Sequence, residues 1–194
     1  MLFRSGYELV GLASTATKES KERVRSAIKN SGYFYSTKRI TVNLAPADTK
    51  KEGPSFDLPI ALGILAASNQ IEGNKYKDFV FVGELSLDGK LRHVNGIMPI
   101  LISAMQNGEK RFVIPKDNER EASYIDGIEV YALESLNQVV DFLQGEEIAP
   151  VATSNYQSAV QTHGYGMDFA DVKGQAVAKR ALEIAVAGGH NVLP

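Results

Sequence analysis

The sequence contains no cysteine, and this absence excludes disulfide bonds and thiolate metal sites. A chain without cysteine fits a reducing compartment, so we expect a cytoplasmic protein. Long apolar runs are also missing. The longest, residues 58–67, is interrupted by Pro59 and Gly63 and is too short to span a bilayer. The amino-terminal residues lack the apolar core and cleavage site of a secretory signal. We therefore predict no membrane partner.

What is present is the composition of an ordinary globular protein. The 194 residues are 44% hydrophobic and 23% charged, which is enough for one sizeable domain or a domain plus part of another. The net charge of −2 is unevenly distributed. Residues 1–51 carry ten Lys and Arg against four Asp and Glu, while the remainder carries 11 against 19. Such asymmetry can indicate an anionic partner, although a solvated basic helix face is the simpler alternative.

Apolar periodicity predicts alternating strands and helices over the first 145 residues. The predicted strands are residues 7–12, 39–44, 79–87, 90–94, 111–114 and 129–132. The predicted helices are residues 15–30, after a cap at Ser14 or Thr15, and residues 58–69, 96–106, 118–124 and 136–143. Asp88 and Gly89 form a two-residue turn signal that joins two strands in a hairpin. This order indicates an α/β (α+β) domain.

The character of the chain changes after Gly145. Residues 146–166 show no apolar periodicity and are predicted to be a linker. A turn at residues 172–174, a helix at residues 175–187 and the beginning of a strand at residues 190–193 follow. A helix and part of a strand cannot bury a core of their own. We therefore predict a front domain (1–145), a linker (146–166) and the truncated start of a second domain (167–194).

Three long segments are specific enough to indicate a family. They are KERVRSAIKNSGY followed by KRITVNLAPAD, then KKEGPSFDLPIALGILAAS with VGELSLDGKLRHVNGI, and finally DFADVKGQAVAKRALEIAVAGGHNVL. Together they resemble the ComM/YifB group of magnesium-chelatase-like AAA+ ATPases over nearly the whole chain. The resemblance implies a Lon-protease-like front domain with the ribosomal-S5-domain-2-like fold, followed by the start of a P-loop AAA+ domain. Members usually begin with a further strand or two before Tyr7, so we expect an unpaired edge in the first sheet.

The resemblance also implies what the intact protein does. It implies ATP and Mg²⁺ as cofactors, assembly into a hexameric ring, and a role in natural transformation as a DNA helicase that drives branch migration. In that family the HNVL strand leads into a Gly-rich phosphate loop ending in Gly-Lys-Thr/Ser. The chain ends at Pro194 without this motif. We therefore expect ATP hydrolysis in the intact protein and no catalysis by this chain alone.

The resemblance implies that one part of a nucleotide site remains in this chain. This part is a turn that would lie beside the adenine of the nucleotide. Its residues are Asp171, Val172, Gly174 and Gln175. The alternative is that this turn only caps the helix that follows it.

The resemblance to Lon implies a protease-like site. Lys51 to Ser55 (KEGPS) stand where Lon carries its nucleophilic serine, which makes Ser55 a candidate nucleophile. The position of the Lon base lysine is Met98, and a thioether cannot accept the proton. His93 is a weaker candidate base, and Ser55 could equally cap a helix. We expect no peptidase activity, with a degenerate serine protease as the remote alternative. The acidic residues show no spacing suited to a metal site.

A DNA contact rests on basic residues near the amino terminus, on the first predicted helix and its adjoining loops. They are Lys18, Lys21, Arg23, Arg25, Lys29, Lys38, Arg39, Lys50 and Lys51. Lys and Arg that neutralise phosphates give sequence-independent, salt-sensitive binding. The alternative is a protein-binding or ring-assembly module that never contacts DNA. The acidic remainder and the lack of aromatic residues among the basic ones favour this alternative.

Overall fold

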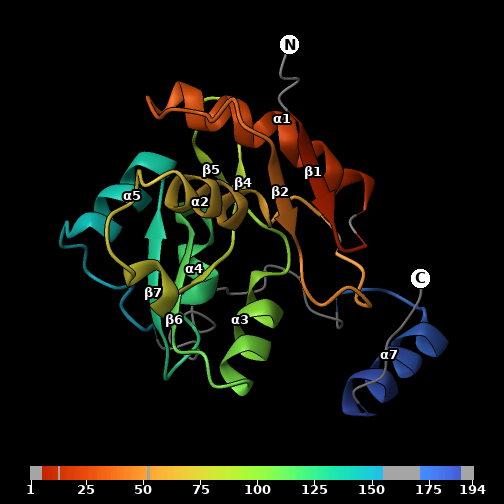
Figure 1. Cartoon of the computed structure of the whole chain (residues 1–194). Helices are drawn as coiled ribbons and strands as arrows, with labels where there is room; N and C mark the ends of the chain where they lie inside the picture. Colours follow the sequence, from red (N-terminus) through yellow and green to blue (C-terminus); the bar gives the residue numbers. More distant parts are fainter. Residues whose placement is uncertain (1–5, 13, 52, 155–170, 189–194) are drawn as a thin grey trace. The chain divides into compact units, whose positions relative to one another are not determined.

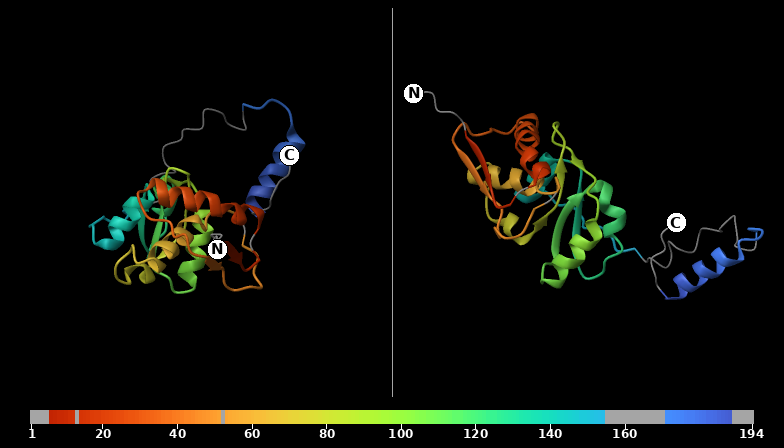
Figure 2. Two further views of the ribbon diagram at one scale, coloured as in Figure 1. Left: turned by 45° about the horizontal axis from the view of Figure 1, so that its top comes forward. Right: turned by 90° about the vertical axis from the view of Figure 1, so that its right-hand side faces the viewer.

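The computed structural model describes residues 6–12, 14–51, 53–154 and 171–188. The chain divides into two compact units, residues 1–154 and residues 155–194. Each unit is described by itself. Figures 1 and 2 show the ribbon of the first unit as a mixed α/β structure built on small sheets. The α/β prediction is confirmed at this level.

The first layer is a small parallel sheet with one long helix. β1 (Tyr7–Val10) pairs in parallel with β2 (Ile40–Asn43), and α1 (Thr15–Asn30) connects them. Ser14 caps α1 as predicted, because its hydroxyl accepts a hydrogen bond from the Thr17 N–H at 3.2 Å. The predicted strand through residue 12 ends early, at Val10. Gly11 has a φ of +103° and lies so close to the Leu44 carbonyl that no Cβ would fit.

The central layer is a three-stranded parallel sheet in the order β3-β6-β7. Its strands are β3 (Val80–Phe81), β6 (Arg111–Pro115) and β7 (Glu129–Leu133). The surrounding helices are α2 (Asp57–Ala67), α3 (Ile97–Gln106), α4 (Glu119–Ala122) and α5 (Leu136–Gln144), with short 3₁₀ turns η1 (Lys75–Asp78) and η2 (Lys116–Asn118).

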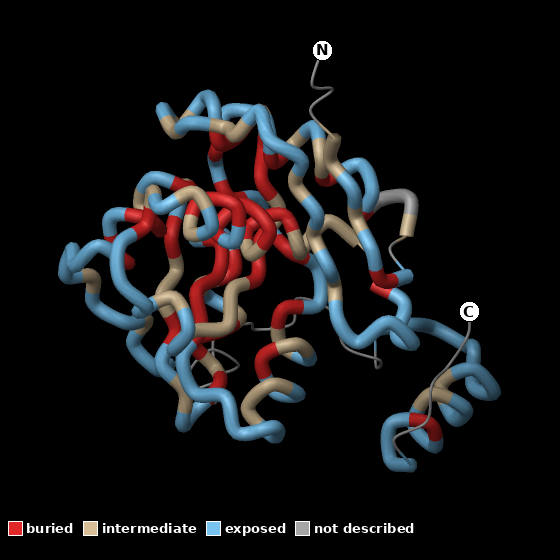
Figure 3. The backbone as a smooth tube through the Cα atoms, viewed as in Figure 1, coloured by how far each residue is buried: buried red, intermediate tan, exposed pale blue. Residues whose placement is uncertain are grey.

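Both faces of this sheet are buried, as is usual for parallel strands. Successive residues of β6 point to opposite faces. Val113 packs into a cluster with residues of α1, α2 and α5, whereas Phe112 and Ile114 pack into a second cluster with Ile97 and Leu101 of α3. Figure 3 shows the buried residues concentrated along these strands and α2. The two clusters form the core that positions the loops described below.

The predicted strand 79–87 is wrong, because the chain changes sheets in its middle. β3 ends at Phe81, and β4 (Glu84–Leu85) pairs instead with β5 (Leu91–Arg92) in an antiparallel hairpin. Gly83 lies at the break. Its N–H donates to the Ser55 carbonyl at 3.0 Å, and its own carbonyl accepts from the Leu58 N–H at 3.0 Å. The chain therefore leaves the central sheet at this point. Its backbone instead provides a hydrogen-bond acceptor for a backbone N–H in the first turn of α2.

The hairpin turn is also longer than predicted. Leu85 pairs with Leu91, and the Ser86 N–H donates to the Lys90 carbonyl. Three residues, Leu87 to Gly89, therefore form the loop, where two were expected. Gly89 takes a φ of +85°, which is typical of the last residue in a three-residue hairpin loop.

The first unit continues past Gly145. The Val151 N–H donates to the Val130 carbonyl at 2.7 Å, and the Ser154 N–H donates to the Ser123 carbonyl at 2.8 Å. The first residues of the predicted linker are thus hydrogen-bonded to this unit. In the second unit, α7 (Ala176–Gly188) matches the predicted helix closely. The predicted strand 190–193 lies outside the described residues. No helix in the described ranges has the length and apolarity needed to cross a membrane.

Candidate functional site

The protease-like loop is fixed against the start of α1. The hydroxyl of Thr17, which is buried, donates to the carbonyls of Lys51 (3.1 Å) and Gly53 (3.2 Å), and the Ser14 N–H donates to the Lys51 carbonyl (2.9 Å). The Lys51 side chain is itself buried, and its ammonium donates to the Pro46 carbonyl. Lys51 is therefore structural and does not belong to a phosphate-binding surface.

Among the described residues, the hydrogen bond of Ser55 is made by its backbone carbonyl, which accepts from the Gly83 N–H. The residue before α2 is Phe56, without a side-chain cap, so the expectation that Ser55 caps this helix is wrong. Met98 is half-buried and packs against the second core cluster. His93 hydrogen-bonds to Asn118 (3.1 Å) and lies 3.9 Å from a Glu121 carboxylate oxygen, which are structural contacts. A serine attacks only when a base removes its proton, so the absence of peptidase activity stays a prediction.

Arg23 and Asp57 form an ion pair between α1 and α2. The guanidinium donates to both carboxylate oxygens, at 2.7 and 3.2 Å, and the Leu85 N–H donates to Asp57 at 3.3 Å. The Asp57 side chain is 0% exposed and that of Arg23 is 21% exposed. Burial raises the pKa of Asp57, and the bonds from Arg23 and Leu85 offset part of this rise. Arg23 was predicted to contact DNA, but it is engaged inside the fold.

Four of the nine basic residues line one concave surface, which we call the basic groove. It measures about 100 Å³ and includes Lys21, Arg25 and Lys29 of α1 with Lys38 from the following loop. The three helix residues are spaced four apart and therefore share one face of α1. The Arg25 guanidinium lies 5.9 Å from the centre of the Tyr35 ring, within range of a cation–π contact. Among the described residues that line this groove, none carries a carboxylate.

The remaining basic residues lie outside the basic groove. Arg39 is exposed and pairs with Glu8 at 2.6 Å. Lys18 and Lys50 are exposed on α1 and on the loop before Lys51. The structure therefore brings Lys21, Arg25, Lys29 and Lys38 together in the basic groove, whose lining does not include Arg23, Arg39 or Lys51. Sequence spacing could identify the stripe on α1, but it could not show that Lys38 completes it.

The turn predicted to lie beside an adenine begins α7. The Gln175 carbonyl accepts the first helical hydrogen bond, from Lys179 N–H at 2.9 Å, and the Lys179 ammonium donates to the Val172 carbonyl. Gly174 and Gln175 have φ values of +72° and +54°. These contacts fit the alternative that the turn caps the helix, and contact with a nucleotide stays a prediction.

The sequence lacks the phosphate-binding loop, and the part of the chain that the structure describes holds no cluster of metal ligands. The Gly-x-x-x-x-Gly-Lys-Ser/Thr loop is absent from the 194 residues. Across the described ranges, no group of three or more His, Asp and Glu residues could hold a metal ion. We therefore assign no step of ATP hydrolysis to this chain.

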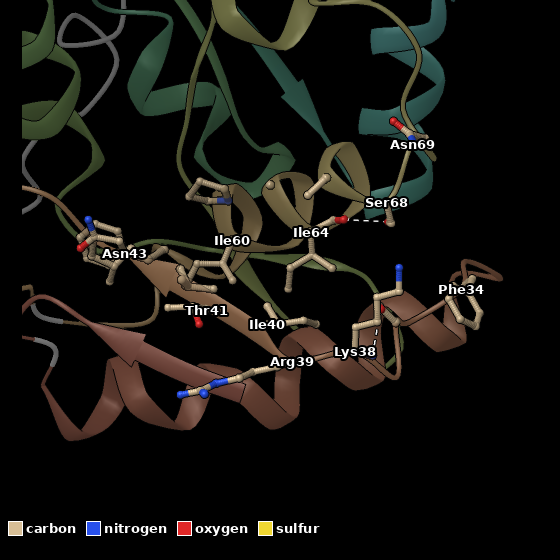
Figure 4. Close-up of a pocket in the computed structure, with 17 residues that line it drawn as sticks. Phe34, Lys38, Arg39, Ile40, Thr41, Asn43, Ile60, Ile64, Ser68 and Asn69 are labelled. Atoms are coloured by element: carbon tan, nitrogen blue, oxygen red, sulfur yellow. Dashed lines mark hydrogen bonds between the residues drawn. The ribbon is translucent and has the colours of Figure 1, made fainter. Parts of the chain in front are cut away.

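A larger groove was missed by sequence reasoning. We call it the β2–α2 groove: it lies between β2 and α2, measures about 820 Å³, and is lined mainly by apolar side chains. Figure 4 shows Ile60 and Ile64 of α2 facing Ile40 of β2, with Lys38 and Phe34 at one end. Phe34 is 63% exposed. No local pattern could have revealed this groove, because its two walls are separated in sequence.

Comparison with known proteins identifies the family of this chain. Residues 4–118 match the family model described as subunit ChlI of Mg-chelatase, and residues 168–194 match magnesium chelatase, subunit ChlI. The chain is 48% identical over 192 residues to competence protein ComM of Haemophilus influenzae, covering 98% of this chain and 38% of that protein. It is 46% identical over 190 residues to YifB of Escherichia coli, covering 97% of this chain and 36% of that protein.

The chain therefore belongs to the ComM/YifB group of the magnesium-chelatase-like family. It spans less than two fifths of the length of these two relatives. Similarity to Lon protease 2 of Bacillus subtilis is weaker: 31% identity over 125 residues, covering 64% of this chain and 22% of that protein.

Proposed function

We propose that this chain is the front part of a magnesium-chelatase-like AAA+ ATPase that acts on DNA. In this proposal the intact protein binds ATP and Mg²⁺, forms a hexameric ring in the cytoplasm, and moves DNA strands during the uptake and recombination of incoming DNA. The front domain has the ribosomal-S5-domain-2-like fold, and the residues from 167 onward begin the P-loop domain. Support comes from family membership and from the relative named as a competence protein.

The observation that carries the DNA contact is the convergence of Lys21, Arg25, Lys29 and Lys38 in one groove, whose described lining contains no carboxylate. Four cations on one concave surface attract a polyanion regardless of its base sequence. Glu22, whose carboxylate lies 4.0 Å from the Lys21 ammonium, weakens this field at one end. Arg23 and Lys51 are left out of the proposed interface because they make internal contacts.

The test is fluorescence anisotropy of labelled single-stranded and forked DNA with the 194-residue chain at several salt concentrations. With about four phosphate contacts, log K against log salt should have a slope of roughly −3 to −4. The double variant Arg25→Gln, Lys29→Gln should lower the magnitude of this slope by about 1.5 to 2. Lys110→Gln, an exposed position away from the basic groove, serves as the control and should change nothing. A flat salt titration, or equal slopes for all variants, would remove the DNA contact.

A further inference from the structure

The chain that follows α5 remains attached to the first unit as far as Ser154. We call residues 147–154 the strap. The Val151 N–H donates to the Val130 carbonyl of β7 at 2.7 Å, and the Ser154 N–H donates to the Ser123 carbonyl at 2.8 Å. The hydroxyls of the same two serines are also hydrogen-bonded to each other. The strap is therefore fastened to the first unit at its middle and at its end.

Two residues of the strap reach the core, on opposite faces of the central sheet. Ile148 packs against the cluster that contains Val113, and Val151 packs against the cluster that contains Phe112. The strap therefore crosses the edge of the sheet at β7, which pairs only with β6 among the described strands. An uncovered edge strand is a template for unwanted pairing, and the strap covers this one at Val130.

The strap is held less firmly than the sheet that it covers. Ile148 and Val151 are only partly buried, and the other six residues of the strap are exposed. In β6, by contrast, Phe112, Val113 and Ile114 are fully buried. Segments with few buried apolar contacts open locally at a lower free energy than the core of the same unit. The strap should therefore open while both core clusters stay intact.

Pro150 favours the return of an opened strap. Its ring fixes its own φ and restricts the preceding residue, Ala149, to extended backbone. The opened segment therefore keeps less conformational freedom than an ordinary chain, and docking it again costs less entropy. Both residues are exposed, so this restriction is their main contribution to the docked strap.

We propose that the strap opens and closes reversibly, and so sets how much chain separates the two units. While it is docked, the first unit holds the chain as far as Ser154. When it opens, the first unit holds the chain only to Glu146, whose N–H donates to the Asp141 carbonyl at the end of α5. Opening therefore adds eight residues, or at most about 28 Å, of chain between the units. This device does not depend on DNA binding in the basic groove.

Amide hydrogen exchange of the 194-residue chain tests whether the strap opens by itself. We expect the Val151 and Ser154 amides to exchange at least about tenfold more slowly than an unstructured peptide, and at least about 100-fold faster than the amides of β6. Exchange at the rate of β6 would make the strap a fixed part of the core. Exchange at the rate of an unstructured peptide would mean that it is not docked. Either result would overturn the proposal.

Paired serine substitutions test the contacts that hold the strap. The open variant, Ile148→Ser, Val151→Ser, should lose at least about tenfold in protection of the strap amides. Its control, Ala149→Ser, Ala152→Ser, changes two exposed positions and should keep the protection of the parent. The amides of β6 should stay protected in both variants. Equal protection of the strap in the two variants would contradict the proposal.

A disulfide should hold the strap closed. The sequence contains no cysteine, so Ser123→Cys, Ser154→Cys introduces a single pair, at positions whose hydroxyls are in contact. The Val151 amide should exchange at least about tenfold more slowly in the oxidised protein than in the reduced protein. Equal rates would show that the strap does not open by this movement.

The added length is measured by pulsed electron paramagnetic resonance between two spin labels. Lys110→Cys places one label on the first unit and Val177→Cys places the other on α7, both at exposed positions. The longest distances should increase in the open variant, by at most about 28 Å, and should not change in its control. An unchanged distance distribution in the open variant would overturn the proposal and would leave the DNA contact unaffected.

Discussion

At the scale of single residues, the Arg23–Asp57 pair decides how two helices meet. A buried carboxylate without a partner is costly, and removing one member of a buried pair typically destabilises by roughly 3–5 kcal/mol. Asp57 is fully buried, while Arg23 can still reach solvent at one side. The cost of losing Arg23 therefore falls mainly on the carboxylate that remains.

We predict that Arg23→Met lowers the free energy of unfolding by about 3 kcal/mol near neutral pH. Burial raises the pKa of Asp57, and losing Arg23 raises it further. A group whose folded-state pKa is raised contributes stability at low pH and loses it as the pH rises through that value. The deficit of the variant should therefore shrink as the pH falls. Urea denaturation across this range, with Arg120→Met as an exposed control, checks the prediction; an equal deficit at all pH values would point to lost packing.

Ser55 carries the second prediction at this scale. Its carbonyl accepts from Gly83, and the lysine position of a Lon-like site is Met98. We expect no cleavage of unfolded substrates and no modification of Ser55 by a fluorophosphonate probe, because the thioether of Met98 cannot take its proton. Mass spectrometry of the treated protein, compared with Ser55→Ala, measures this. A Ser55-dependent adduct would restore the protease interpretation.

At the scale of elements, the beginning of α2 depends on Gly83. A Cβ at this position would meet Leu91 Cδ2 at 2.9 Å and Leu58 Cβ at 3.3 Å, so the hairpin and α2 approach too closely for a side chain. The same glycine supplies the carbonyl that receives the Leu58 N–H. One small residue thus joins the central sheet, the hairpin and a helix terminus.

We predict opposite effects for alanine at two glycines. Gly83→Ala should destabilise by about 1–3 kcal/mol, because the core must shift to admit the methyl group. Gly63→Ala, in the middle of α2 with open space around it, should stabilise by about 0.5–1 kcal/mol by reducing the freedom of the unfolded chain. Chemical denaturation of both variants measures the difference. Similar effects of the two substitutions would mean that the close approach at Gly83 is not present in solution.

At the scale of the whole molecule, residues 1–154 contain both core clusters, whereas α7 exposes apolar side chains. Val177 and Val186 are 86% and 81% exposed, and among the described residues of α7 only Ala185 is buried. An amphipathic helix gains most of its stability from packing its apolar face. Within the described ranges, the second unit shows no core of its own.

We predict that residues 1–154, produced alone, unfold cooperatively with the same midpoint as the 194-residue chain. Residues 155–194 should change self-association but not that midpoint, because both core clusters lie before Ser154. Thermal denaturation by circular dichroism and sedimentation of both proteins test this. A large drop in the midpoint would show that the second unit supports the first.

The sequence by itself determined the elements whose signals are local. The Ser14 cap, the strand β6 and the glycines that follow α1 and α5 depend on neighbouring residues, and each lies where predicted. Its long motifs also determined the family. Tertiary structure alone decided the break at Gly83, the burial of Lys51, the division of the basic residues and the open β2–α2 groove. These depend on contacts between residues far apart in the chain, which no short window of sequence contains.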